Sequence, residues 1–419
     1  MRRWFPRAGL LLAVLAATLV PSTAAYAAFT DVPTSYWDYT AIDYVGQQHT
    51  WMQDYGTSTF KPTTYEQRRY LARTLVTIYA PNEPIDPSIT FTDLPSTDPF
   101  YRYANVSAKL DWLPAFADGT WGPTNRLPKR VFDRALILAM GDFTDAIYGL
   151  QHIHMGNGTE YSVNKYVPYM QLASWLGLHY NHDDETMDVG PKTDMKRDEV
   201  AYSVWEATTM PTWQIADASV FDDIEIASVN TSLADGKARQ ALTDYALDQI
   251  GYPYVWGGEW NDKTPTGYCC GAQPIGGMDC SGFVWWTMKR NEGGYNAAQF
   301  HPTYTGWALA QRTSSDMAAN TGTKITWSNL KAGDLMFFSS SGGTSAGSVD
   351  HVGFYLGRNW MINSASGTDG VVIEEVSSGW FYDHFVYGRR IIGSSSSASI
   401  RQQLYDPRAG EAGSGPPPR

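Results

Sequence analysis

The segment Asp279-Cys280-Ser281-Gly282-Phe283-Val284 leads into the apolar run Trp285-Trp286-Thr287-Met288 and decides the fold of the C-terminal part of this chain. Asp279 carries the type of side chain that caps helix N-termini, so the segment predicts a helix with Cys280 in its first turn. A thiol attacks only as thiolate, and the positive end of a helix lowers a thiol pKa. The sequence therefore favours Cys280 as a nucleophile over a small buried hydrophobe, the usual role of a free cysteine.

The residues before this segment predict a helix and a glycine-rich loop. Apolar side chains at helical spacing mark one face of the helix, which Gly251 and Pro253 end. These side chains are Ala238, Leu242, Tyr245 and Ala246. The loop that follows is Tyr254-Val255-Trp256-Gly257-Gly258.

The residues after the helix predict a mostly antiparallel sheet. Its strands are short apolar runs bounded by turn residues, and two of them flank the turn Gly357-Arg358-Asn359 as a hairpin. The predicted strands are 334–338, 351–356, 360–364, 371–376 and 385–391.

His351 and Asn363 stand on the two strands of this hairpin, and the midpoint between them is Gly357, inside the turn. They should therefore lie opposite or nearly opposite each other, with Cβ atoms about 5 Å apart. An Asn carbonyl placed there accepts the imidazole N–H and turns the other ring nitrogen towards a thiol, as in a nucleophile, base and orienter set. Asp350 and Asp369 are competitors for the orienting role.

Four motifs in this part of the chain resemble those of the NlpC/P60 family of cysteine peptidases. They are Tyr254-x-Trp256-Gly257-Gly258, Asp279-Cys280-Ser281-Gly282, Gly333-Asp334-Leu335-x-Phe337-Phe338 and His351-Val352-Gly353-x-Tyr355. The resemblance covers residues 237–393. It implies a papain-like α+β domain, with an antiparallel sheet and a nucleophile helix at its N-terminal side, that hydrolyses peptide bonds in peptidoglycan stem peptides.

The same resemblance assigns roles to individual residues. Cys280 matches the nucleophile, His351 the base, and Asn363 the third polar position, which varies in the family. Tyr254, Asp279 and Ser281 match residues that line the substrate end of the cleft. The backbone N–H of Cys280 would serve an oxyanion hole, and no metal or cofactor is implied.

One departure from the family pattern is a long connection from Glu259 to Met278. It contains Cys269 and Cys270, two of the three cysteines, so no disulfide framework spans the chain. The insertion is expected near the nucleophile, where it would gate or reshape the cleft or form a vicinal disulfide.

The N-terminal half contains a repeat with a period of about 61 residues. Phe29-Thr30-Asp31-Val32-Pro33 returns as Phe91-Thr92-Asp93-Leu94-Pro95, and a third unit opens at Phe143-Thr144-Asp145. Within a unit the pattern predicts helix, loop, helix, so neighbouring units should bury their apolar faces against one another.

These units resemble S-layer homology repeats, which implies an all-α domain at 28–210 with repeats at about 29–80, 91–140 and 143–210. Three such repeats form a helical pseudo-trimer that holds secondary cell-wall polymers, so a wall polymer is a candidate partner. The family's T-R-A-E segment is replaced in the first two units. Its counterparts are Tyr65-Glu66-Gln67-Arg68, Pro128-Lys129-Arg130-Val131 and Lys196-Arg197-Asp198-Glu199. A helical spacer that holds no polymer is the alternative.

The chain ends and the charge indicate an exported protein. Residues 1–27 have the charged start, the apolar centre and the A-x-A end of a signal peptide, and the thirteen apolar residues from Ala8 to Val20 are too few to cross a bilayer. Loss of Arg2, Arg3 and Arg7 with this leader changes the formal net charge from -12 to -15. That acidity argues against nucleic acid and anionic lipid as partners.

Three further assignments complete the sequence-based prediction. Residues 211–236 show no sustained period and are predicted to be a linker, while the Ser/Gly/Pro-rich residues 394–419 are predicted to be a disordered tail. The histidines are predicted to be solvated or loop residues rather than metal ligands. They are His152, His154, His179 and His182.

The predicted function is a secreted, cell-wall-associated hydrolase of the D-γ-glutamyl-diamino acid endopeptidase type. One alternative is a non-catalytic wall-binding or S-layer-binding protein, against which the intact Cys280 and His351 count. Another is a thiol amidase or acyltransferase, because a thioester intermediate can pass to water or to an amine.

Overall fold

The computed structural model describes residues 28–184, 187–260, 276–288, 309 and 311–393. The predicted leader at 1–27, the residues Cys269 and Cys270 and the predicted tail at 394–419 lie outside these residues. In the part of the chain that is described, no helix is both long and apolar enough to cross a bilayer.

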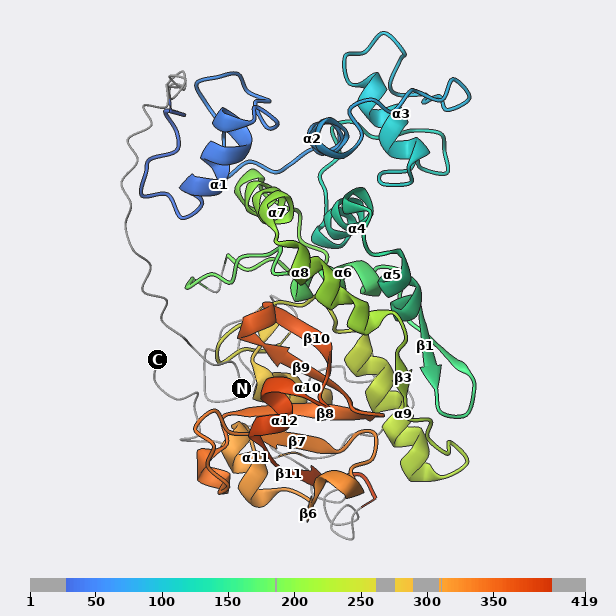
Figure 1. Cartoon of the computed structure of the whole chain (residues 1–419), viewed down its shortest axis with the longest axis vertical. Helices are drawn as coiled ribbons and strands as arrows, with labels where there is room; N and C mark the ends of the chain where they lie inside the picture. Colours follow the sequence, from blue (N-terminus) through green and yellow to red (C-terminus); the bar gives the residue numbers. More distant parts are fainter. Residues whose placement is uncertain (1–27, 185–186, 261–275, 289–308, 310, 394–419) are drawn as a thin grey trace, which may run out of the picture.

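Seven helices and one π-helical turn build the N-terminal half, in the upper part of Figure 1. They are α1 (Tyr39–Asp43) with η1 (Tyr44–Gln48), α2 (Arg68–Tyr79), α3 (Tyr101–Lys109), α4 (Lys129–Met140), α5 (Thr144–Gln151), α6 (Val167–Trp175) and α7 (Arg197–Thr209). Helix α2 packs against α3, α4 against α6, and α7 returns to α1. The helices therefore close into a ring of three pairs.

Backbone hydrogen bonds repeat three times around this ring. Arg68 N donates to Asn125 O (3.0 Å), Lys129 N to Thr193 O (2.9 Å) and Arg197 N to Thr64 O (2.9 Å). Arg68, Lys129 and Arg197 are therefore equivalent first residues of α2, α4 and α7. In the first unit, the segment that corresponds to 196–199 therefore begins at residue 67, two residues after the predicted start at residue 65.

The counterpart of Lys196-Arg197-Asp198-Glu199 in the first unit is Gln67-Arg68-Arg69-Tyr70 rather than 65–68. Each of the three helix starts follows Pro62, Pro123 or Pro191 by six residues, a spacing that was present in the sequence.

The repeated Phe-Thr-Asp segment has a structural reason in the first two units. The two carboxylate oxygens of Asp31 accept from Phe60 N (2.9 Å) and Lys61 N (2.7 Å). Those of Asp93 accept from Trp121 N (2.7 Å) and Gly122 N (2.8 Å). Each aspartate thus accepts hydrogen bonds from two backbone N–H groups in the loop that precedes the second helix of its unit.

Two predictions about this half are wrong. The third unit is not all-α, because it contains the hairpin β1 (His152–Met155) and β2 (Glu160–Ser162), which β3 (Glu225–Ile226) extends in parallel to β1. The predicted linker 211–236 is not structureless, because it forms α8 (Thr212–Asp217), η2 (Ala218–Phe221) and β3.

The packing of Phe221 explains why the linker prediction failed. This side chain is fully buried, with ring centroids 5.1 Å from Trp175 of the N-terminal half and 6.1 Å from Trp360 of the C-terminal half. The apolar residues of this segment contact two different partners in turn. They therefore show neither a helical nor a strand period along the sequence.

The C-terminal half is built on a six-stranded antiparallel sheet, with strand order β10-β9-β8-β7-β11-β6. The strands are β6 (Thr323–Ile325), β7 (Leu335–Phe338), β8 (His351–Gly357), β9 (Trp360–Ala365), β10 (Gly370–Glu375) and β11 (Phe385–Arg390), and a separate pair is β4 (Glu259–Trp260) with β5 (Gly277–Met278). The helices are α9 (Ala234–Leu247), α10 (Cys280–Met288), α11 (Ser314–Asn320) and α12 (Gly379–His384). Helix α10 packs on β8 and β9.

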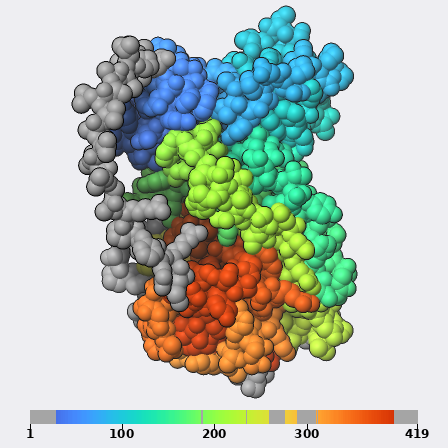
Figure 2. Space-filling model, viewed as in Figure 1, coloured from blue at the N-terminus to red at the C-terminus, as the bar shows by residue number. Residues whose placement is uncertain are grey.

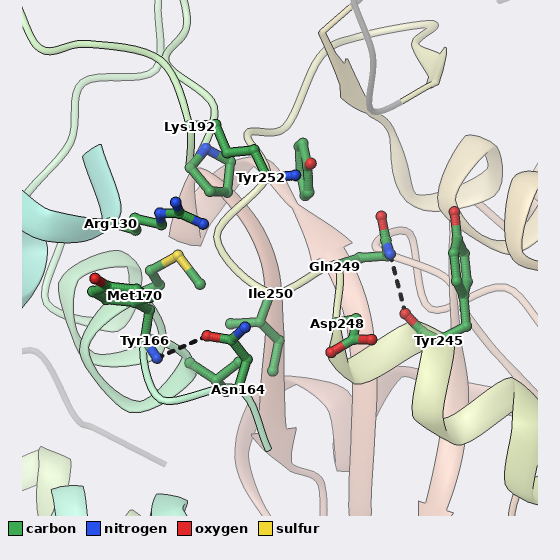
Figure 3. A pocket seen from close by; sticks show the side chains of 12 residues that line it. Arg130, Asn164, Tyr166, Met170, Lys192, Tyr245, Asp248, Gln249, Ile250 and Tyr252 are labelled. Atoms are coloured by element: carbon green, nitrogen blue, oxygen red, sulfur yellow. Dashed lines mark hydrogen bonds between the residues drawn. The ribbon is translucent and has the colours of Figure 1, made fainter. Parts of the chain in front are cut away.

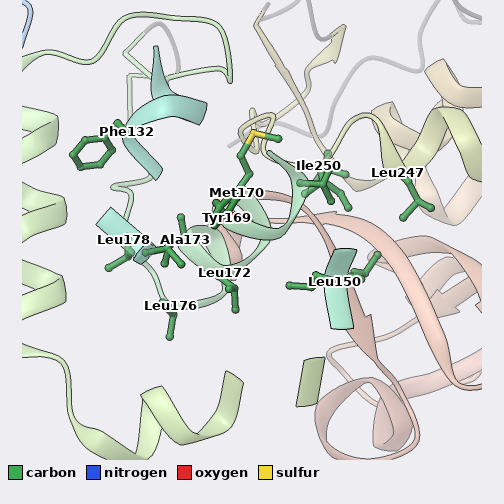
Figure 4. Packing of buried hydrophobic residues seen from close by; sticks show 14 of the residues in the cluster. Phe132, Leu150, Tyr169, Met170, Leu172, Ala173, Leu176, Leu178, Leu247 and Ile250 are labelled. Carbon is green, nitrogen blue, oxygen red and sulfur yellow. The ribbon is translucent and has the colours of Figure 1, made fainter. Parts of the chain in front are cut away.

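One hydrophobic cluster runs through both halves, from Phe29 to Ile392. Side chains of α6 lie between Phe132 on one side and Leu247 and Ile250 on the other (Figure 4). In the space-filling view, the yellow-green residues of α7 to α9 run from the upper half onto the lower half (Figure 2). The two halves are therefore packed together rather than joined by a free linker.

Candidate active site

Cys280 is the first residue of α10, as the sequence predicted. Asp279 caps the helix, because its Oδ1 accepts from Gly282 N at 2.5 Å. All nine residues of α10 are buried, which explains why its sequence is apolar on every side. The cap and the buried helix together fix the thiol in the domain core, where it is 8% exposed.

The Cys280 sulfur lies beside the start of β8. Its Sγ is 3.9 Å from Asp350 O, and the backbone N–H of Val352 also interacts with it. These two residues flank His351 in the sequence. The packing of α10 on β8 therefore places the predicted nucleophile against the backbone of the residues on either side of the predicted base.

His351 is held by Asn363, as predicted, with 2.8 Å between Nε2 and Oδ1. The Asn363 amide nitrogen donates to Glu374 Oε2 at 2.6 Å, which leaves its carbonyl oxygen for the imidazole. The ring nitrogen that faces Asn363 therefore carries the proton. His351 Nδ1 is then the unprotonated nitrogen, which can act as a base.

The strand register differs from the predicted one. Phe354 pairs with Ile362 and Tyr355 with Met361, so the same register, continued one step, places Asn363 opposite Gly353 rather than opposite His351. A Cβ added at Gly353 would lie 2.9 Å from the Asn363 Cβ. Because position 353 has no side chain, Asn363 reaches His351 diagonally across the two strands.

Burial keeps both reactive groups neutral in the resting site. The pKa of the Cys280 thiol is raised to about 12, first by burial and then by the Asp279 charge. Burial also lowers the pKa of His351, against the opposing effect of the Asn363 hydrogen bond. The predicted lowering of the thiol pKa by the helix end is therefore outweighed by burial.

Arg312 is a site residue that the sequence analysis missed. Its buried guanidinium lies 3.2 Å from Asp279 Oδ1, donates to Ser281 Oγ at 2.7 Å and donates to the carbonyl oxygens of Gly257 and Gly258 at 3.1 and 3.2 Å. Arg312 thereby ties the glycine-rich loop to the start of α10, and its charge lowers the Cys280 pKa. Only its arginine identity could have pointed to it, because no motif surrounds it.

The three predicted substrate-binding residues lie around this arginine and the glycine-rich loop, and all are buried. Asp279 contacts Gly257 N (3.1 Å) in addition to its cap and Arg312, and Ser281 Oγ donates to Asp279 at 3.0 Å. Tyr254 is 9% exposed at the start of the loop. The contacts of Asp279 and Ser281 shape the loop and the helix start, while their contact with substrate stays a prediction.

Aromatic side chains form a wall beside His351. The rings of Phe338 and Phe381 have centroids 6.0 and 5.7 Å from the imidazole. Trp380 and Tyr382 on the same helix α12 are exposed. This wall excludes water from one side of the imidazole and contributes to the burial that lowers its pKa.

The other histidines follow the prediction in part. His179 and His182 lie in the loop after α6, as predicted, but they are buried, and their Nε2 atoms lie 2.8 Å from Asp133 and Glu199 respectively. His152 and His154 lie on the strand β1 instead of in a loop. Within the described ranges, no group of three or more His, Cys, Asp or Glu residues has the arrangement to hold a metal ion.

A cavity of about 340 Å³ lies between the two halves and apart from the predicted catalytic residues. Figure 3 shows Arg130, Lys192 and Tyr166 on the side of the N-terminal half and Asp248, Gln249 and Tyr252 on the other. Its walls carry both signs of charge. The cavity belongs to the junction of the halves and not to the thiol site.

The part of the chain that contains Cys280 and His351 is similar to a known protein family. Residues 251–390 match the model of the NlpC/P60 family. These residues are an NlpC/P60 domain. The family resemblance predicted from the four motifs is thereby confirmed for this part of the chain.

Two similar proteins have endopeptidase in their names. The chain is 29% identical over 157 residues to murein DD-endopeptidase MepH of Escherichia coli, covering 37% of this chain and 47% of that protein. It is 34% identical over 146 residues to the bifunctional muramidase/DL-endopeptidase CwlT of Bacillus subtilis, covering 34% of each. The chain thus spans half or less of the length of these relatives.

Among solved structures, the peptidoglycan hydrolase RipB of Mycobacterium tuberculosis is 25% identical, with a TM-score of 0.26, covering 39% of this chain and 70% of that one.

Proposed function

We propose that the protein is a secreted cell-wall hydrolase that cleaves peptide bonds in peptidoglycan stem peptides. The observation that carries the proposal is the placement of Cys280 at the start of α10, beside the residues that flank His351, with His351 held by Asn363 at 2.8 Å. The relatives support the substrate class, since MepH is named a murein DD-endopeptidase and CwlT a bifunctional muramidase/DL-endopeptidase.

In the proposed mechanism, His351 Nδ1 takes the proton of the Cys280 thiol as the sulfur attacks the scissile carbonyl carbon. The negative charge on the carbonyl oxygen develops near the Cys280 N–H at the positive end of α10. The imidazolium then gives its proton to the leaving amine, and a thioester remains. Water, deprotonated by His351, hydrolyses the thioester and restores the thiol.

The protonation states of Cys280 and His351 before substrate binds determine when the thiol loses its proton. Since both the thiol and the imidazole are neutral before substrate binds, proton transfer accompanies attack rather than preceding it. Asn363 keeps the imidazole oriented and stabilises the charged form, because the hydrogen bond to Asn363 raises the His351 pKa.

The proposed bond is the one between D-γ-glutamate and the diamino acid. This choice rests on the family resemblance of the motifs. The names of MepH and CwlT differ in the bond they describe, DD in one and DL in the other. The products of digestion must therefore identify the bond.

The deciding experiment incubates purified peptidoglycan with residues 28–419 and, as a matched control, with the Cys280→Ala variant. Mass spectrometry of the soluble fraction then detects stem-peptide fragments. Fragments released by the first protein alone support the proposal and identify the bond from the new amine. Folded protein that releases none under reducing conditions overturns the hydrolase and leaves a wall-binding protein or a thiol enzyme with another acyl substrate.

We also propose that the N-terminal ring retains the enzyme at the envelope by binding a wall polymer. The threefold repetition of helix pairs and backbone hydrogen bonds supports this proposal, because it matches the arrangement that the S-layer homology resemblance implies. The test compares retention of Cys280→Ala on intact walls and on walls stripped of secondary polymers by acid. Equal retention on both would remove the anchoring role.

A further inference from the structure

Glu374 is a buried carboxyl group on β10 that the mechanism above does not use. Its side chain is 8% exposed, and its Oε2 accepts from the Asn363 amide nitrogen at 2.6 Å. Asn363 in turn meets the His351 ring at 2.8 Å. Three strands, β8, β9 and β10, thus carry one continuous polar chain that ends at the imidazole.

The chemistry of Glu374 determines how the Asn363 amide is oriented in this series of hydrogen bonds. An Asn amide can present either its oxygen or its nitrogen to a histidine, and only the oxygen accepts a ring N–H. An ionised carboxylate accepts and cannot donate, so it selects the orientation in which the Asn363 nitrogen faces Glu374. The Asn363 oxygen then faces His351 Nε2, and Nδ1 is left as the base.

We propose that Glu374 is a positioning residue that holds the Asn363 amide in the one orientation that lets His351 act as a base. The proposal rests on the thiol mechanism given above. Glu374 has no contact with Cys280 and touches no substrate in that mechanism. Among the described residues, its side-chain hydrogen bond is to Asn363, and its effect on His351 passes through that amide.

A residue of the N-terminal half holds the strand that carries Glu374. Gln171 on α6 is fully buried, its Nε2 donates to Ile373 O and its Oε1 accepts from Ile373 N, both at 2.9 Å. Since β10 is the edge strand of the sheet, this side-chain amide replaces one pair of bonds that a further strand would make. Gln171 therefore fixes β10 one residue away from Glu374.

The protonation of Glu374 provides a signature for the test. Burial raises its pKa to about 7, so the carboxylate that selects the Asn363 orientation forms as the pH rises through that value. The neighbouring strand β9 contributes Asn363 and the packed helix α6 contributes Gln171, both uncharged. The charges that act on His351 are Asp350 and Asp279. Because the raised pKa of the Cys280 thiol makes its reactivity climb with pH over this whole range, the Glu374 contribution should appear as an additional step near pH 7 on that slope.

The test measures the rate of Cys280 alkylation by iodoacetamide from pH 5.5 to 8.5 in residues 28–419, following the Cys280 peptide by mass spectrometry. Glu374→Ala is expected to slow alkylation at pH 8 about tenfold, since a hydrogen bond to a charged group is lost. Glu374→Gln keeps an acceptor, so it should stay within about threefold of the wild type at pH 8 but lose the step. The control Glu375→Gln changes the next residue of β10, which does not contact Asn363, and should keep both the rate and the step.

A second arm tests the contribution of the N-terminal half. Gln171→Met removes both bonds to Ile373 at similar volume and should lower the alkylation rate at pH 8. Gln214→Met also removes a hydrogen bond from a Gln side chain to a backbone carbonyl, that of Leu176, but at a site that does not contact β10. It should leave the alkylation rate unchanged. Equal rates in the two variants would overturn the role given to Gln171.

The outcomes separate this proposal from the proposed function. Profiles of Glu374→Ala and Glu374→Gln that match the wild type overturn the positioning role, and if the alanine variant does not fold, the glutamine profile decides alone. If the pH step depends on Glu374 but the protein releases no stem peptides, the positioning role is supported and the proposed substrate is wrong.

Discussion

Gly353 lies opposite Asn363 across the β8–β9 hairpin, and its missing side chain leaves the space through which Asn363 reaches His351. A Cβ at position 353 would come within 2.9 Å of the Asn363 Cβ and 2.7 Å of the Met361 sulfur. The glycine in the His351-Val352-Gly353 motif is therefore required by the geometry of the base.

Gly353→Ala is expected to displace Asn363 and lower kcat about 100-fold, because a histidine without its orienting partner is a poor base. The loss of stability should be smaller, about 1–3 kcal/mol, as for other overpacked cores. Turnover and thermal unfolding measure the two effects. Gly367→Ala is the control, because no atom lies within 4 Å of its added Cβ. Full activity in Gly353→Ala would contradict the diagonal contact.

Arg312→Met should destabilise the protein by about 3–5 kcal/mol, because it leaves the Asp279 charge buried beside the thiol without its cation. The double variant Asp279→Asn, Arg312→Met removes both charges and should recover part of this loss. Denaturant unfolding of the two variants measures the difference. If the double variant is as unstable as the single one, the guanidinium acts through its contacts with Gly257 and Gly258 rather than through the ion pair.

Asp38 predicts a pH effect on stability. It is 3% exposed, and burial, with help from Asp198 and Glu199, raises its pKa from 3.8 to about 9. The unfolded chain therefore loses this proton near pH 4 while the folded protein keeps it, so the Asp38 contribution to stability falls as the pH rises from 4 towards 9.

Asp38→Asn removes the titrating group and should stabilise the protein at pH 8 relative to pH 5 by at least about 1 kcal/mol, compared with the wild type. Melting temperatures at both pH values provide the measurement. Asp43→Asn is the control, because Asp43 lies at the other end of α1, which Asp38 precedes, and is bonded to Gln48 at an exposed site. An identical pH dependence in Asp38→Asn and wild type would show that Asp38 is ionised in the folded protein.

Phe221→Ala tests whether the two halves unfold together. The substitution removes a fully buried ring between Trp175 and Trp360 and should cost about 3–5 kcal/mol. Because the cluster is continuous, we expect one cooperative transition in both proteins, shifted to lower temperature in the variant. Two separate transitions in the wild type would mean that the halves are independent domains.

Local sequence patterns were sufficient for much of the C-terminal half. The Asp279 cap, the Cys280 helix and the β8–β9 hairpin were each encoded within a few residues, and the structure has all three. The register of the hairpin was not predictable in the same way. Arg358 and Asn359 both adopt left-handed φ angles, 53° and 66°, so the turn is centred after Gly357, and a bulge between Tyr355 and Gly357 shifts the pairing by one residue.

Residues whose roles depend on distant partners escaped the sequence analysis. Arg312 meets Asp279 across 33 residues, and Gln171 meets Ile373 across 202. The burial of the loop residues His179 and His182 was missed because their carboxylate partners, Asp133 and Glu199, lie on helices elsewhere in the sequence. The repeat period revealed the ring, whereas the packing of 211–236 on both halves left no periodic signal.

The contact of Gln171 with β10 affects any truncated form of this chain that lacks the N-terminal half. Residues 237–393 on their own would leave the outward-facing N–H and C=O of Ile373 without partners, whereas those of Val371 stay bonded to Tyr252 O and Gly251 N. Unpaired backbone groups on an edge strand are a place where a second copy can pair. The N-terminal half thus covers the part of the β10 edge that the C-terminal half leaves open.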